Sequence, residues 1–171
     1  NAIQINPNHV DALNNLGNAL KELGEYKKAM SYYRKAIKIK PDYVSAYNNL
    51  GVAFNELGKD QKAINYFQKA IKINSNYANA HNNLGAISNQ LGKLQKAKNC
   101  YKKAIEIKPD YSEAYWNLHS LASNTDEALT ILKKLYNIDN KFIKAKIMIS
   151  ALQGFKGNFG DYNALIALPE S

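Results

Sequence analysis

The sequence predicts an all-α protein, built as an array of antiparallel helix hairpins that wind into a superhelix. Three observations predict this fold class: an internal repeat, apolar side chains at helical spacing inside each repeat, and helix-ending residues at fixed places. Repeats of about 20–50 residues are typical of such arrays, in which each unit packs only against its neighbours. The composition agrees, because 46% of the 171 residues are hydrophobic and 22% are charged, near globular averages.

The repeat is visible in the segment Asn-Asn-Leu-Gly, which begins at Asn14 and returns at Asn48 and Asn82, always 34 positions on. Alignment of residues 10–43 with 44–77 gives 19 identities in 34 positions. We therefore expect one domain, composed of full repeats at 10–43, 44–77 and 78–111, a degenerate repeat at 112–142 and a decayed C-terminal repeat or cap at 143–171. Residues 1–9 match the end of an upstream repeat, so we expect the natural protein to extend beyond Asn1.

Each repeat contains two helices, with glycine between them and, in most repeats, proline after them. Leu13, Leu16 and Leu20 mark the apolar face of the first helix. Gly24 ends this helix, because glycine adopts the left-handed conformation at low cost. Pro41 stops the second helix. The expected helices span 10–23, 26–39, 44–57, 60–73, 78–91, 94–107, 112–122, 125–137 and 143–153.

These motifs resemble the tetratricopeptide repeat family. That family places a large residue, then Leu-Gly, then another large residue on the first helix, and alanine, an aromatic residue and alanine on the second. The matching residues of the first repeat are Leu13, Leu16, Gly17, Leu20, Ala29, Tyr33 and Ala36. The resemblance is strong over residues 1–111 and weaker beyond. It implies a right-handed superhelix with first helices along a concave groove and second helices on the convex side.

The later repeats depart from the family pattern. In the third repeat, Ile87 and Ser88 replace alanine and a large residue, so we expect altered packing there. In the fourth, His119 occupies the glycine position and the inter-helix turn is three residues shorter. A turn-like segment at 157–159 marks the decayed last unit.

The first candidate binding residues are asparagines that directly precede Leu-Gly, or its drifted equivalent, in four repeats: Asn15, Asn49, Asn83 and Asn117. An asparagine amide both donates and accepts hydrogen bonds. Stacked hairpins would align these amides in a ladder that holds the backbone of an extended peptide. By resemblance, such a ladder holds protein substrates in the repeat region of O-linked N-acetylglucosamine transferase. The alternative is that asparagine is merely a common solvated residue at this position.

A second set of candidates flanks the same groove, namely Asn14, Asn48 and Asn82, with Asn18 included and Trp116 in the fourth repeat. An exposed tryptophan would suit a binding hot spot. The alternative for Trp116 is packing between repeats. The family's clamp for the carboxylate tail of heat-shock chaperones requires a lysine where this chain has the three asparagines, so we expect no binding of that tail.

Charge and motifs argue against other function classes. The net charge is +9, but the lysines recur on second helices, as Lys28, Lys62 and Lys96 do. We therefore expect nonspecific attraction of polyanions and no specific nucleic-acid recognition. We expect no catalytic residue, cofactor or metal: the glycines at 154, 157 and 160 lack the preceding strand of a phosphate loop, and Cys100 has no partner spacing for zinc. No apolar run reaches the roughly 18 residues of a membrane span.

The resulting prediction is a protein–protein interaction scaffold, not itself an enzyme, that binds extended peptide segments of a partner. The alternative is a substrate-recruiting or dimerising arm of a larger enzyme, such as a glycosyltransferase or methyltransferase, with its catalytic domain elsewhere. Self-association is compatible with either reading. The compartment stays open, with the cytoplasm favoured.

Overall fold

We describe residues 7–154 from a computed structural model of the chain. All regular structure in this range is helical. The helices are α1 (Pro7–Glu22), α2 (Tyr26–Ile39), α3 (Val44–Glu56), α4 (Asp60–Ile73), α5 (Ala78–Gln90), α6 (Leu94–Ile107), α7 (Ser112–His119), α8 (Thr125–Ile138) and α9 (Ile143–Gly154). The residues around the phosphate-loop-like glycines 157 and 160, and the upstream segment 1–6, lie outside the described range.

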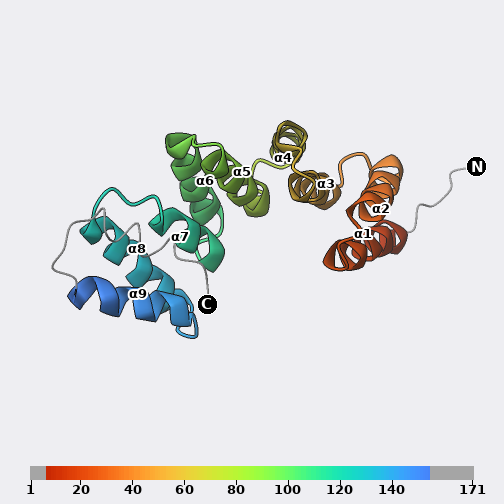
Figure 1. Cartoon of the computed structure of the whole chain (residues 1–171). Coiled ribbons are helices and arrows are strands. Elements are labelled where there is room, and N and C mark those ends of the chain that lie inside the picture. Colours follow the sequence, from red (N-terminus) through yellow and green to blue (C-terminus); the bar gives the residue numbers. More distant parts are fainter. Residues whose placement is uncertain (1–6, 155–171) are drawn as a thin grey trace, which may run out of the picture.

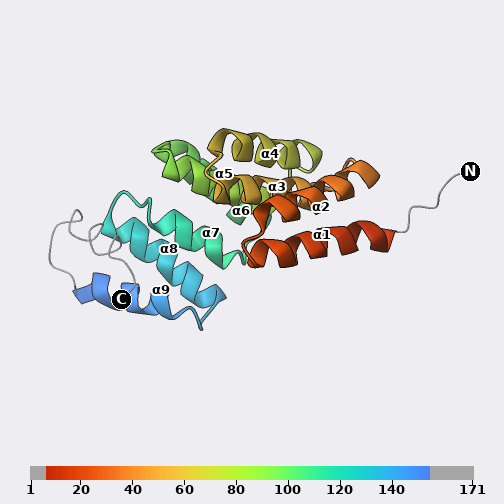
Figure 2. The same ribbon diagram turned by 45° about the vertical axis from the view of Figure 1, so that its right-hand side comes forward.

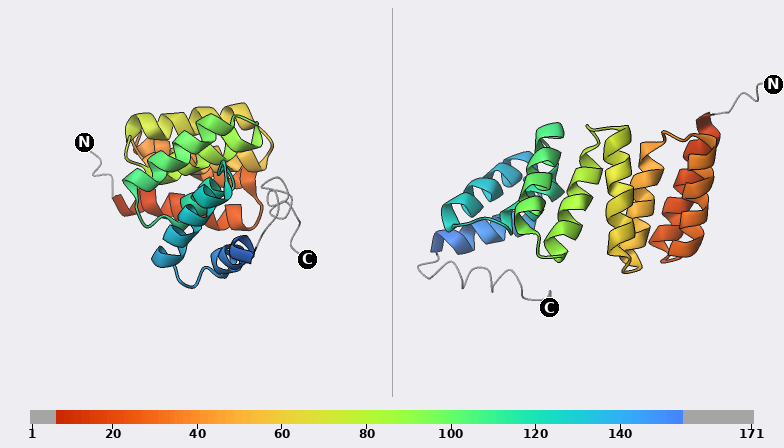
Figure 3. Two further views of the ribbon diagram at one scale, coloured as in Figure 1. Left: turned by 90° about the vertical axis from the view of Figure 1, so that its left-hand side faces the viewer. Right: turned by 90° about the horizontal axis from the view of Figure 1, so that it is seen from above.

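The helices pair into hairpins that follow one another along an arc (Figure 1). Helices α1, α3 and α5 lie on the inner side of the arc, and α2, α4 and α6 lie on its outer side. The turned views show the hairpins side by side in a row, with α9 packed on α8 at the end (Figures 2 and 3). The first helices also contact each other, α1 with α3 and α3 with α5. The predicted array of helix hairpins is confirmed.

The turns inside the first three hairpins share one geometry. Each contains a glycine of positive φ, at Gly24 (74°), Gly58 (65°) and Gly92 (69°). In the first turn, the N–H of Glu25 donates to the carbonyl of Leu20, and the N–H of Gly24 donates to that of Lys21, both at 2.9 Å. This pair of bonds defines the Schellman end of a helix. The prediction that Gly24 ends the first helix is confirmed.

A second set of glycines lies where the two helices of a hairpin touch, and all three members are buried: Gly17, Gly51 and Gly85. A Cβ on Gly51 would lie only 2.5 Å from a ring carbon of Phe67. Tyr33 and Tyr101 cover the other two glycines in the same way. The absence of a side chain therefore lets the aromatic ring of the second helix pack directly on the backbone of the first.

The fourth hairpin has different residues at both of these positions. His119 occupies the glycine position of the repeat, and Leu132 occupies the aromatic position. Both side chains are almost completely buried. The larger residue on α7 is thus accompanied by a side chain on α8 that is smaller than the aromatic ring of the other hairpins.

Two helix boundaries differ from the predicted ones by three residues. Helix α7 ends at His119 and not at 122, because the shortened connection must turn the chain earlier; the N–H groups of Leu121 and Ala122 donate to carbonyls only three residues back. Helix α1 begins at Pro7, three residues before the expected start. Proline fits this place because the first turn of a helix needs no N–H donor.

Candidate functional site

The first helices carry the candidate asparagines in adjacent pairs with different exposure. The first member of each pair is buried, with exposed fractions of 6% for Asn14, 5% for Asn48 and 0% for Asn82. The second member is more accessible: Asn49, Asn83 and Asn117 are half-buried, and Asn15 is exposed. Successive helix positions lie about 100° apart around the axis, so neighbours in sequence face different surroundings.

Hydrogen bonds join these asparagines into a ladder that crosses every junction between the four hairpins. In each junction, the amide nitrogen of the second member donates to the amide oxygen of the first member in the preceding hairpin. The bonds are Asn49 to Asn14 (3.0 Å), Asn83 to Asn48 (2.9 Å) and Asn117 to Asn82 (3.1 Å). In each bond the donor and acceptor residues are 35 positions apart in the sequence, which is one 34-residue repeat plus one position. We call this set the asparagine ladder.

Asn18 strengthens the first rung of the asparagine ladder. Its amide oxygen accepts a second bond from Asn49 at 2.9 Å and one from the Tyr33 hydroxyl at 3.0 Å. Burial, with a smaller contribution from the charge of Glu22, raises the pKa of Tyr33 to about 12, so this hydroxyl is a donor at neutral pH. Asn18 therefore links the ladder to the aromatic contact inside the first hairpin.

The buried members have little hydrogen-bonding capacity left for a ligand. The amide nitrogen of Asn82 donates to Glu113 at 3.0 Å, and that of Asn48 approaches the oxygen of Asn49 at 3.4 Å. Asn14, Asn48 and Asn82 thus lie between helices, whereas the sequence suggested that they flank the open groove. Their structural task is to accept the bond from the next hairpin.

Two of the half-buried members, Asn83 and Asn117, keep groups available. Asn49 does not, because its amide nitrogen donates to both Asn14 and Asn18 and its oxygen accepts from Asn48. Among the described residues, the amide oxygens of Asn83 and Asn117 have no hydrogen-bond partner, and each amide nitrogen uses one of its two hydrogens. Asn15 has no described partner for its side chain, and it belongs to the first hairpin, before which the structure describes no further unit. The ladder therefore offers a free donor and a free acceptor on α5, at Asn83, and on α7, at Asn117.

Trp116 lies in a contact between the fourth and fifth units. Its ring centroid is 4.3 Å from that of His119 and 5.3 Å from that of Phe142, and the residue is only partly exposed. The Nδ1 atom of His119 also bonds to the carbonyl of Trp116. This placement favours the packing alternative over the hot-spot interpretation.

The sequence interpretation missed a second set of contacts between repeats, made by the tyrosine before each new first helix. The hydroxyl of Tyr43 donates to Asp11 at 2.6 Å, and that of Tyr77 approaches the hydroxyl of Ser45 at 3.4 Å. Burial and then the bond to Asp11 raise the pKa of Tyr43 to about 12. The sequence did contain a signal for these contacts, since a tyrosine recurs once per repeat just before the first helix, at 43, 77 and 111.

The described residues hold no group of three or more His, Cys, Asp or Glu side chains that could bind a metal ion. No helix within residues 7–154 is long and apolar enough to cross a membrane. Cys100 is half-buried, packs against the core, and has its thiol pKa raised by burial. These properties fit a packing residue better than a nucleophile, which requires a lowered pKa.

Comparison with known families identifies the repeat. Models described as tetratricopeptide repeat or TPR repeat match residues 1–30, 17–58, 44–77 and 78–111. The chain belongs to the tetratricopeptide repeat family. Arrays of this family are in general non-catalytic scaffolds for protein–protein interactions. No curated protein sequence matches the chain significantly.

Several solved structures share the fold. The crystal structure of MamA is 30% identical, with a TM-score of 0.67, and the match covers 83% of this tetratricopeptide-repeat chain and 85% of MamA. The first TPR of Spaghetti (RPAP3), bound to the HSP90 peptide SRMEEVD, is 27% identical with a TM-score of 0.63, and the match covers 70% and 95%. The thermophilic TPR protein TTC0263 of Thermus thermophilus is 23% identical with a TM-score of 0.75, covering 90% and 86%.

Proposed function

We propose that the inner face of this array binds an extended segment of a partner protein through the backbone of that segment. The observation that carries the proposal is the asparagine ladder. The ladder occurs in all three junctions between the four hairpins. Within the described residues, it leaves the amide oxygens of Asn83 and Asn117, and one hydrogen on each amide nitrogen, available for a ligand. An amide side chain matches a peptide group, since each has an N–H donor and a carbonyl acceptor.

The ladder bonds would also prepare these side chains for binding. An asparagine that already donates one hydrogen to its neighbour has a fixed orientation. Less side-chain freedom is then lost when a ligand binds, and such preorganisation favours affinity. Adjacent first helices are about 8–10 Å apart, close to the length of three extended residues. A bound peptide could therefore meet one amide in every three residues, with little dependence on its sequence.

The residues of the asparagine ladder do not suit the acidic tail of a chaperone as a ligand. The structurally similar repeat of Spaghetti (RPAP3) is bound to an HSP90 peptide. In this chain, Asn14, Asn48 and Asn82 stand where the family's carboxylate clamp has a lysine, and all three are buried in the ladder. Their neutral amides supply no positive charge for an acidic tail. We propose a ligand recognised by its main chain instead.

The enzyme-arm alternative stays a prediction. The O-GlcNAc transferase of Thermobaculum terrenum has a similar array, with a TM-score of 0.69, but the identity is 19% and the match covers 26% of that chain. Similarity at this level of sequence identity shows only that the two chains share a fold. The sequence of the complete gene tests the alternative, which requires a catalytic domain in the same polypeptide.

The test of the proposed function starts with short peptides selected from a random library on the unmodified chain. The double variant Asn83→Ala, Asn117→Ala should bind a selected peptide about tenfold more weakly, because each hydrogen bond contributes about 0.5–1.5 kcal/mol. Fluorescence anisotropy measures the affinity, and circular dichroism checks that the variant stays folded.

The matched control removes two asparagines that lie on second helices, away from the ladder, Asn99→Ala with Asn137→Ala. Both side chains are exposed, so this variant should bind like the unmodified chain. The proposal is wrong if the control loses the peptide and the ladder variant retains it.

A further inference from the structure

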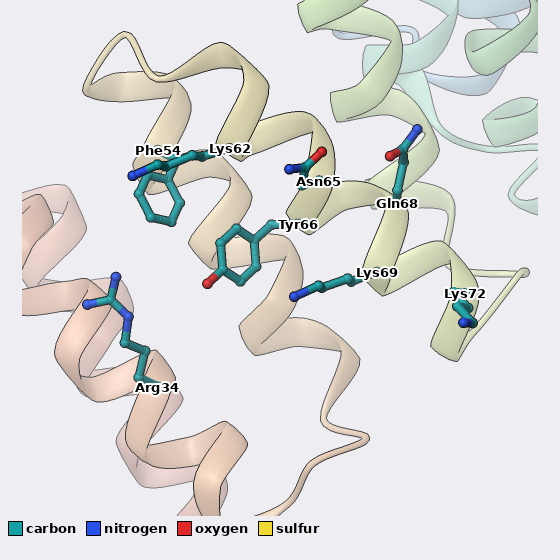
Figure 4. A pocket seen from close by; sticks show the side chains of 8 residues that line it. All are labelled: Arg34, Phe54, Lys62, Asn65, Tyr66, Gln68, Lys69 and Lys72. Atoms are coloured by element: carbon teal, nitrogen blue, oxygen red, sulfur yellow. The ribbon is translucent and has the colours of Figure 1, made fainter.

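A basic pocket lies on the outer side of the array, where the first two hairpins meet. Its cavity of about 590 Å³ has Arg34 of α2 on one side, Phe54 of α3 at one end and six residues of α4 along its length (Figure 4). The residues that define it here are Arg34, Phe54, Lys62, Tyr66, Lys69 and Lys72. The asparagine ladder, in contrast, runs along the first helices.

The charge of the basic pocket is not compensated within the described part of the chain. Four of its eight lining side chains are basic and none is acidic. The ion pairs found among the described residues involve other lysines, namely Lys21, Lys28, Lys98 and Lys103. A concave surface with charge of one sign concentrates the field and attracts ligands of the opposite sign.

Two aromatic rings hold lysines at the pocket. Phe54 and Tyr66 stack with centroids 5.2 Å apart and planes inclined by 17°. The ammonium of Lys62 lies 5.7 Å from the Phe54 centroid, and that of Lys69 lies 5.3 Å from the Tyr66 centroid. Figure 4 shows both lysines pointing toward these rings. The rings thus hold the cations by cation–π attraction and, being covered, offer no free platform for nucleobases.

The period of the repeat provides an internal comparison, because the next junction has equivalent positions. There Ser88 replaces Phe54, Cys100 replaces Tyr66 and Glu106 replaces Lys72. Glu106 also pairs with Lys103, the equivalent of Lys69, at 2.7 Å. Both rings are lost together and the charge at the four equivalent positions falls from +4 to +1, although the surrounding repeat is similar. The basic pocket is therefore a feature of one junction and not a consequence of the repeat itself.

We propose that the basic pocket binds an acidic segment of a partner protein. Its lysines are distributed from Lys62 to Lys72, which spans about 15 Å of helix. This length exceeds a single phosphate group but matches several aspartate or glutamate carboxylates along one chain. Arg34 faces them from the neighbouring hairpin and can bind a carboxylate with two parallel hydrogen bonds. The array then has a second binding surface, opposite in position and different in chemistry from the ladder.

The test uses a fluorescein-labelled peptide with six consecutive glutamates. The double variant Arg34→Gln, Lys69→Gln should bind it about tenfold more weakly at low salt, because two of the four positive charges of the pocket are lost. The control Lys96→Gln, Lys133→Gln removes the same charge at two exposed lysines outside the pocket and should change the affinity less than about twofold.

Two results would overturn the proposal. Equal weakening in both double variants would show attraction by net charge alone. Tighter binding of a six-nucleotide thymidine oligomer than of the glutamate peptide, with the same dependence on Arg34 and Lys69, would assign the pocket to nucleic acid. All four substituted side chains are exposed, so folding should persist, and melting curves check this.

Discussion

Asn82 and Asn83 are neighbours in the sequence, yet their side chains have separate tasks. Asn82 is fully buried, accepts from Asn117 and donates to Glu113. Asn83 is half-buried, donates to Asn48 and keeps its oxygen open. A buried amide must find partners within the protein because water cannot reach it. The pair thus combines one residue that joins hairpins with one that can contact a ligand.

Gly51 provides a test at the same scale. Its replacement by leucine should destabilise the array by about 1–3 kcal/mol or more, because the new side chain overlaps the ring of Phe67. Urea unfolding followed by circular dichroism measures the loss. Gly58→Leu is not an equivalent control, because Gly58 has a positive φ; an exposed helical position such as Asn65→Leu is suitable. An unchanged midpoint for the Gly51 variant would contradict the close contact.

At the scale of elements, the hairpin of α7 and α8 differs most from its neighbours. Its first helix is short, its turn lacks the glycine of positive φ, and it buries His119. Asn124 compensates at the start of α8, where its side chain accepts from the N–H of Glu127. Lys98 of α6 pairs with Glu127 at 2.6 Å and ties this hairpin to the third. The hairpin of α7 and α8 thus keeps the architecture of the other hairpins but is stabilised by different local contacts.

Burial of His119 makes this hairpin sensitive to acid. Burial lowers the pKa of His119 below its usual value, so the unfolded chain binds a proton more readily than the folded one. The stability contributed by the neutral histidine is present above pH of about 6.5 and is lost as the pH falls through its folded pKa. Hydrogen exchange should show α7 and α8 losing protection before α1 to α4 as the pH drops from about 7 to 5.

The variant His119→Leu removes the titrating group and keeps an apolar side chain of similar size. It should abolish the selective loss of protection in this pH range. Simultaneous loss of protection in all hairpins, in both proteins, would show that His119 is not responsible.

At the scale of the whole molecule, the period of the sequence was sufficient to predict the array. Seven of the nine described helices begin and end within one residue of their predicted bounds. These bounds could be predicted because glycine, proline and apolar spacing act locally. The ladder could not be derived in the same way. Whether Asn49 bonds to Asn14 or faces solvent depends on the twist between hairpins, which no local pattern of residues specifies. The early end of α7 likewise depended on how a shortened turn closes.

We expect the open amides of the asparagine ladder to bind a peptide backbone. The most direct measurement is nuclear magnetic resonance of the side-chain amides in asparagine-labelled protein, during titration with a peptide selected on the unmodified chain. The signals of Asn83 and Asn117 should shift in proportion to saturation, while those of Asn99 and Asn137 on the second helices should stay in place. Shifts confined to Asn99 and Asn137, with the ladder signals unmoved at saturation, would contradict binding by the ladder.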